Sequence, residues 1–350
     1  MGSMDRREFL KSTGAAAAAA TAASATAQPT LAAPAVAAGL QELRLAMPWA
    51  EGYAGPADWA HRLGQSIMQL SGGRYRIVPT FAVADGLAAV SADDADLYFG
   101  GDPDAHRGLA FFSGLPGDRG MSPQHLQTWV SVGGGQALWD DLAGELGVKP
   151  LLAAHTGRHS YLLATERVES MAGLAGRKAH LHGLARDVGR GLGLEPVTLV
   201  PSELAGAMRR GDVLAAECGG AITSYALGLP GVAPHSAGTS FNRNGTAFFL
   251  GILRALWDGF GSAEQAMFAA AAAGEYQQSL AEEDAHRRML LPDAPAERTW
   301  PIAAELAHAI RRVADAVVAH AAGTDARTRR ISDSYTAFRH AVVGADEAIA

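Results

Sequence analysis

Few residues of this chain combine the type and the spacing of a known catalytic motif. The sequence has no GxGxxG after a predicted strand, no Walker A motif, no GxSxG and no HExxH. The usual signatures of dinucleotide, phosphate, serine-hydrolase and zinc-protease chemistry are therefore missing. The glycine triplet 133–135 lacks the strand before it and the Lys-Ser pair after it that a phosphate-binding loop needs. These absences predict a protein that is not an enzyme.

The beginning of the chain has the order of features of a twin-arginine export signal. Arg6 and Arg7 are adjacent, a Phe-Leu pair and a lysine follow them, and residues 14–23 are almost pure alanine. Small residues that suit signal cleavage come next, at 25–27 and at 35–37. The alanine run is shorter and less hydrophobic than a membrane span requires. We therefore expect residues 1–37 to be a signal peptide that starts with a tag remnant, and the mature protein to lie in the periplasm.

Composition and charge fit a folded chain of two domains that does not bind nucleic acid. The 350 residues are 48% hydrophobic and 19% charged, which provides enough apolar side chains for a large core. The net charge is -7 and no basic stretch follows the leader, whereas nucleic-acid binding needs clustered lysine and arginine. Cys218 is the only cysteine, so no intramolecular disulfide forms. A single cysteine is most often a small buried side chain, and a ligand-facing thiol is the alternative.

The hydrophobic pattern after the leader alternates between strands and helices, which indicates an α/β fold with a mostly parallel sheet. Strands are predicted at 43–47, 75–79, 95–99, 151–154, 161–164, 178–181, 196–199, 213–216 and 248–253. Helices are predicted at 57–70, 123–146, 186–192, 202–210, 263–291 and 302–343. The glycine triplet should break the second of these helices, and Ser202 should cap the fourth. A second run of β-α-β units begins near residue 150, which predicts two α/β domains in a hinged clamp with a cleft.

Three sets of short segments match the pattern of one family in their order and spacing. They are 109–112 with Trp129 and 133–140, then 154–157 with 174–178, and finally 196–199 with 211–212 and 216–217. In these segments the chain resembles the TRAP-transporter solute-binding proteins of the DctP-like superfamily, in the branch that binds α-keto acids and related monocarboxylates. The resemblance extends from about residue 43 to residue 290.

The resemblance implies a two-lobed, type II-like periplasmic-binding-protein fold with the ligand between the lobes. It places residues 42–157 and 246–286 in lobe I, and residues 158–245 and 287–345 in lobe II. It also implies a small-molecule ligand and delivery of that ligand to the TRAP membrane permease subunits. A homodimer through a long C-terminal helix is a further expectation, with residues 302–343 as that helix.

The chain departs from the family at the position that pairs with the ligand. The resemblance implies an arginine there, but this chain has His180, and the proline position two residues later is His182. An imidazole lacks the bidentate geometry and the permanent charge with which arginine holds a carboxylate, so we expect a ligand other than a simple keto acid. Because alternate side chains of a strand share a face, these two histidines should point to the same side.

The other site positions that the resemblance implies are also altered. His159 replaces a glutamine, Cys218 replaces a tryptophan and Arg243 replaces an acidic residue, whereas Glu217 is retained. His155 is a further cleft candidate. The aromatic candidates either line the cleft or pack in the core, and they are Trp49, Tyr53, Phe99 and Phe241.

Three kinds of ligand remain open for this site. Neutral imidazoles suit a polar neutral ligand through hydrogen bonds, and protonated imidazoles beside Arg243 suit an anion. His159, His180 and Glu217 suit a metal ion or a metal complex, so no cofactor is certain and a bound metal ion is the one candidate. The alternatives to transport are a His-rich metal-binding protein, a periplasmic metalloenzyme on the same scaffold, and a sensor or chaperone subunit.

Overall fold

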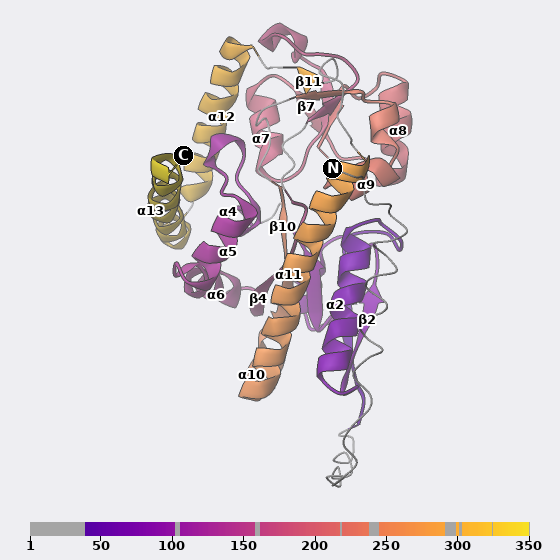
Figure 1. Cartoon of the computed structure of the whole chain (residues 1–350), viewed down its shortest axis with the longest axis vertical. Helices are drawn as coiled ribbons and strands as arrows, with labels where there is room; N and C mark the ends of the chain where they lie inside the picture. Colours follow the sequence, from indigo (N-terminus) through magenta and orange to yellow (C-terminus); the bar gives the residue numbers. More distant parts are fainter. Residues whose placement is uncertain are drawn as a thin grey trace, which may run out of the picture. The chain divides into compact units, whose positions relative to one another are not determined.

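Two separate β-sheets organise the chain, as Figure 1 shows for the computed structural model. The structure describes residues 39–101, 106–157, 162–217, 219–237, 245–290, 299–300, 303–323 and 325–349. All of the described helices and strands belong to one compact body, Leu40–Ala350. The predicted signal peptide lies outside the described residues.

The first sheet has five strands and is covered by helices on both faces. Its order is β2 (Tyr75–Thr80), β1 (Gln41–Ala46), β3 (Leu97–Gly100), β10 (Ala247–Leu253) and β4 (Val148–His155). Along β10 the side chains alternate between two cores, because Phe248 and Leu250 belong to one cluster and Phe249 to the other. The first cluster is closed by α2 and α11, and the second by α3 to α6 together with α13.

The second sheet has six short strands. Its order is β11 (Thr299–Trp300), β9 (His235–Ala237), β5 (Leu163–Ala164), β8 (Ala215–Ala216), β6 (Lys178–His180) and β7 (Glu195–Val197). One core cluster joins it to α7 and α12, and a smaller cluster joins it to α8. The predicted pair of α/β units is therefore present: the first unit is the five-stranded sheet with its helices, and the second is the six-stranded sheet with its helices. The lobe boundaries given above stay a prediction.

The prediction of a mostly parallel sheet is confirmed for both sheets, since in each of them one described strand runs against the others. β1 runs parallel to β2 and β3, whereas β10 runs antiparallel to both β3 and β4. In the second sheet β5 is antiparallel to β8 and to β9.

The longer helices begin and end close to the predicted residues, whereas the short helices α3, α4, α9 and α10 were not predicted. They are α2 (Pro56–Leu70), α3 (Gly86–Ser91), α4 (Ala110–Ser113), α5 (Pro123–Ser131), α6 (Gly135–Gly144), α7 (Leu184–Gly191), α8 (Pro201–Arg209), α9 (Ala221–Ala226), α10 (Arg254–Gly259), α11 (Ser262–Leu290), α12 (Ala304–Ala322) and α13 (Ala326–Ile349), with short 3-10 turns at Arg107–Leu109, Gly117–Arg119, Met171–Gly173 and Leu229–Gly231. The predicted break at the glycine triplet is confirmed, since α5 ends before it and Gly134 has a φ of 87°. Ser202 does not cap α8: the helix begins at Pro201, so Ser202 is already helical.

The C-terminal region forms two helices rather than the single long helix expected for residues 302–343. α12 ends at Gly323, and the carboxylate of Asp325 accepts a hydrogen bond of 2.8 Å from the Thr328 backbone N–H in the first turn of α13. α13 then packs against α4, α5 and α6, beside the first sheet (Figure 1). The predicted long C-terminal helices are thus present, and the expected dimer through them stays a prediction.

α11 is the longest helix and contacts both units. It packs on β4 and α2 of the first sheet unit, and its C-terminal part also contacts α9, the helix that follows β8 of the second sheet (Figure 1). None of the helices in the described part of the chain combines the length and the apolar character needed to cross a membrane.

Candidate functional site

The structure describes seven of the eleven residues that the sequence placed at the ligand site. These are Trp49, Tyr53, Phe99, His155, His180, His182 and Glu217. The other four lie outside the described residues, and they are His159, Cys218, Phe241 and Arg243. The described seven fall into three groups: a histidine pair with Glu217, an aromatic pair, and two side chains in packed interiors.

His180 and His182 lie side by side at the end of β6. Their ring centroids are 4.5 Å apart with an interplanar angle of 87°, which confirms that both point to one face. The two Nε2 atoms are 2.9 Å apart, within hydrogen-bond distance. His180 is buried, at 3% exposure, whereas His182 is exposed.

The hydrogen bonds assign the protons of this pair. The Leu199 backbone N–H donates to His180 Nδ1 at 3.2 Å. A ring nitrogen that accepts a hydrogen bond carries no proton, so neutral His180 holds its proton on Nε2. That Nε2–H then donates to His182 Nε2, and the proton of neutral His182 is on Nδ1. Burial favours the same state, because it lowers the pKa of His180 to about 4.

Glu217 lies next to the histidine pair, at the end of the neighbouring strand. β8 runs parallel to β6, and the Glu217 backbone N–H donates to the His180 carbonyl oxygen at 2.8 Å. Glu217 is buried, at 4% exposure. Its position beside the altered family residue is the position that the resemblance implies for a site carboxylate.

The described residues do not fit a metal centre that has His180 as a ligand. The Nε2 atom of His180 carries a proton while Nδ1 accepts from Leu199, so neither nitrogen has a lone pair available for a metal. Within the described ranges, no cluster of three or more His, Cys, Asp or Glu side chains has the arrangement of a metal site. His159, the third predicted metal ligand, lies outside those ranges.

Trp49 and Tyr53 form the aromatic pair, on the loop between β1 and α2. Their rings stack at 6.2 Å with an interplanar angle of 4°, and both side chains are half-buried. The Trp49 ring also packs on Phe248 of β10, at 5.4 Å between centroids. A planar surface of this kind can stack against a small planar ligand or cover it with apolar area.

Phe99 and His155 lie in packed interiors. Phe99 is fully buried and stacks on Phe248, so it is a core side chain, and the Trp49 ring packs against it. His155 is 2% exposed, and its ring packs edge-on against Tyr276 of α11. The Ser279 hydroxyl accepts a hydrogen bond from the His155 backbone N–H at 3.0 Å, which fixes the end of β4 on α11.

The sequence reasoning missed two buried polar residues beside this region, Thr223 of α9 and Glu283 of α11. Their exposed fractions are 1% and 2%. A sequence signal for Glu283 exists, because it continues the helical stripe of Phe268, Ala272 and Tyr276, all of which are buried. Burial raises the pKa of Glu283 to about 7, and the neighbouring Glu282 charge adds to the rise.

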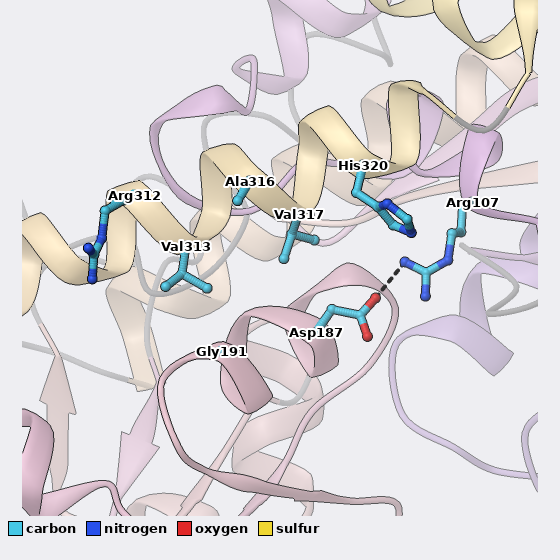
Figure 2. A pocket seen from close by; sticks show the side chains of 8 residues that line it. All are labelled: Arg107, Asp187, Gly191, Arg312, Val313, Ala316, Val317 and His320. Carbon is cyan, nitrogen blue, oxygen red and sulfur yellow. Dashed lines mark hydrogen bonds and ion pairs between the residues drawn. The ribbon is translucent and has the colours of Figure 1, made fainter.

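A separate groove lies between α7 and α12 and contains none of the predicted site residues. Its volume is about 620 Å³, and Figure 2 shows its apolar wall of Val313, Ala316 and Val317. Asp187 of α7 pairs with Arg107 at 2.5 Å at one end of the groove, and with Arg190 at 2.7 Å. Because Asp187 is already paired with two arginines of this chain, the groove offers a different set of polar groups from the histidine site.

Comparison with known proteins agrees with the predicted leader. The family model of the twin-arginine translocation pathway signal sequence matches residues 3–23. The chain therefore carries an export signal of this class, and the prediction of a periplasmic protein is confirmed.

The rest of the chain is similar to periplasmic binding proteins. A monocarboxylate 2-oxoacid-binding periplasmic protein from Nostoc is 27% identical over 240 residues, which are 65% of this chain and 63% of that protein. The match therefore spans less than two thirds of this relative's length.

Solved structures of TRAP periplasmic solute-binding proteins share the fold. One from Bordetella bronchiseptica, with copurified calcium and picolinate, has a TM-score of 0.79 at 20% identity and covers 87% of this chain and 93% of its own. One from Colwellia psychrerythraea, with calcium and pyruvate, has a TM-score of 0.78 at 20% identity and covers 87% and 96%. One from Pseudoalteromonas atlantica, with sodium and pyruvate, has a TM-score of 0.79 at 20% identity and covers 89% and 98%. The predicted fold class and the predicted resemblance are confirmed.

Proposed function

We propose that this chain, which has the fold of the TRAP periplasmic solute-binding proteins and an export signal, is the solute-binding subunit of a TRAP-type transporter. It captures a small molecule between its two sheet units in the periplasm and delivers it to the membrane permease subunits. The observation that carries the proposal is the shared fold, which extends over most of the chain. The relatives are solute-binding proteins, and nothing in the described site supplies a nucleophile with a base and an orienting group.

The ligand that we propose is a polar molecule without a simple keto-acid head group. Structural neighbours hold pyruvate with calcium or sodium, but this chain has a neutral histidine pair where the family pattern has arginine. A carboxylate placed against the pair would meet no permanent positive charge, and the Nε2–H of His180 already donates to His182. A neutral polar ligand needs no such charge and can hydrogen-bond to a neutral imidazole.

The experiment that tests the function is native mass spectrometry of protein purified from its periplasm, followed by thermal-shift assays. The assay panel contains pyruvate with and without calcium, hydroxy acids, amides, amino alcohols and polyols. We expect a copurified small molecule at one per chain, and stabilisation by at least one neutral polar compound. Protein that carries no small molecule and is stabilised by no member of the panel would contradict the proposal.

The oligomeric state is a separate part of the proposal. We propose a homodimer through the C-terminal helices, of which α13 also packs on α4, α5 and α6 of its own chain. Mass photometry of the purified protein distinguishes a monomer of one chain from a dimer of two.

A further inference from the structure

Glu282 and Glu283, adjacent residues on one turn of α11, bind to different sheet units. Glu282 accepts hydrogen bonds from Trp59 Nε1 at 3.2 Å and from Arg62 at 2.8 Å, both on α2 of the first unit. Glu283 instead accepts from the Ala221 backbone N–H at 2.7 Å, at the N-terminal end of α9. Successive residues on a helix point about 100° apart, so this turn of α11 holds α2 on one side and α9 on the other.

The contact between Glu283 and α9 is tight and admits no larger residue. A Cβ atom at Gly220, the residue before α9, would overlap the Glu283 carboxylate. Gly157, which follows β4 and has a φ of 69°, packs on the Cβ of Glu283 from the other side. The Glu283 side chain is therefore flanked by Gly157 at its Cβ and by Gly220 at its carboxylate, and at 2% exposure its bond to α9 is shielded from water.

The opposite side of α9 reaches the loop that carries the aromatic pair. Thr223 Oγ1 donates to the Ala54 carbonyl oxygen at 2.8 Å, and Thr223 is 1% exposed. Ala54 lies one residue after Tyr53, at the end of the loop from β1 to α2. This hydrogen bond directly joins a helix of the second unit to the loop that presents Trp49 and Tyr53.

We propose that Glu283 and Thr223 are positioning residues for ligand capture. Glu283 sets the place of α9 on α11, and Thr223 holds the loop of Trp49 and Tyr53 against the second unit before the ligand arrives. The inference rests on the proposed function, because that loop belongs to the proposed ligand site. In this arrangement α9 links α11 to the loop that carries Trp49 and Tyr53.

The test is hydrogen–deuterium exchange of the ligand-free protein, with three variants. Thr223→Val keeps the shape of the side chain and removes its hydroxyl, Thr223→Ser keeps the hydroxyl, and Glu283→Met keeps the length of the side chain without its acceptor oxygens. Thr165→Val is the matched control, because it also removes a hydroxyl that donates to a backbone carbonyl, that of Leu214, but within the second sheet only.

The expected results differ between the two positions. Thr223→Val should speed exchange in residues 47–58 about fivefold, which is the effect of losing one net hydrogen bond, and should leave the Ala221 amide protected. Glu283→Met should speed exchange both in residues 219–227 and in residues 47–58. Thr223→Ser and Thr165→Val should leave residues 47–58 as in the wild type.

Two outcomes would overturn the inference. The first is unchanged exchange of residues 47–58 in Thr223→Val. The second is an equal increase in β4 and β10, which would mean that the substitution weakens the whole fold. If Glu283→Met does not fold, the Thr223 variants still test the inference. Because every measurement is made without ligand, failure to find a transported solute would leave these results standing and would contradict only the proposed function.

Discussion

His180 Nε2 lies 2.9 Å from His182 Nε2, and the Leu199 backbone N–H donates to the other nitrogen of His180. These two hydrogen bonds keep His180 neutral, because protonation would place two N–H donors against each other at Nδ1. The site thus presents an ordered pair of imidazoles without charge, at the position where the family pattern has a permanent cation.

Acid should destabilise the protein through His180. Burial holds its pKa at about 4 in the folded state, against 6.5 when the side chain is free. The unfolded chain therefore takes up the proton first as the pH falls, so stability is full above pH 6.5 and is lost between pH 6.5 and 4. The largest loss is about 3 kcal/mol for this shift. Urea unfolding at pH 7 and pH 4.5 measures it.

The matched variant for this prediction is His180→Asn, whose amide oxygen can accept from Leu199 and does not titrate. It should lose less stability than the wild type between pH 7 and pH 4.5. Equal losses in the two proteins would show that other groups account for the acid sensitivity.

Pyruvate should bind the wild-type protein weakly and the double variant His180→Arg, His182→Pro more tightly. The variant restores the cation that can pair with a carboxylate in a bidentate manner. Loss of one charge-assisted contact in a desolvated site corresponds to a factor of about 100 in affinity. Titration calorimetry in the presence of calcium should show a gain of at least about tenfold in the variant. Micromolar pyruvate binding by the wild type, unchanged in His180→Ala, would contradict the prediction.

Glu283→Gln should stabilise the protein at alkaline pH. The pKa of the buried carboxyl is raised to about 7 from 4.5, so the folded state holds its proton over a range where the unfolded chain has lost it. Stability of the wild type therefore falls as the pH rises from about 4.5 to 7, and stays low above that. Glutamine keeps an acceptor for Ala221 without the buried charge, so the variant should exceed the wild type by at most about 3 kcal/mol at pH 8.

At pH 4 the Glu283 carboxyl is largely protonated in both the folded and the unfolded state, so wild type and Glu283→Gln should have nearly the same stability there. Chemical denaturation at pH 4 and pH 8 gives the comparison within one pair of proteins. A variant that is less stable than the wild type at pH 8 would show that the charged carboxylate itself is required at the α9 terminus.

Export should depend on the adjacent arginines of the leader. Replacement of Arg6 and Arg7 by lysine removes the planar guanidinium groups and keeps the charge, so the precursor should remain in the cytoplasm. The control is Arg74→Lys with Arg76→Lys, a pair of exposed arginines on the folded domain, which should leave export unchanged. Fractionation and immunoblotting compare the two, and equal periplasmic amounts would count against a twin-arginine route.

The sequence by itself determined most of the secondary structure and the export signal. Periodic apolar residues fixed helices such as α2, in which Trp59, Leu63 and Ile67 are buried at helical spacing. The glycine triplet determined the break between α5 and α6, because Gly134 adopts a left-handed conformation that other residues avoid. These features depend on neighbours along the chain, which a sequence shows directly.

The direction of β10, the return of α13 onto α4 to α6, and the contacts of Thr223 and Glu283 are visible only in the tertiary structure. Each depends on residues far apart along the chain, such as the hydrogen bond between Thr223 and Ala54. The proton positions on His180 and His182 also depend on the tertiary structure, because they are assigned by a hydrogen bond from Leu199, 19 residues away. Residue type gives an imidazole its chemistry, but the groups that pack around it select the protonation state and thereby the ligand that it can hold.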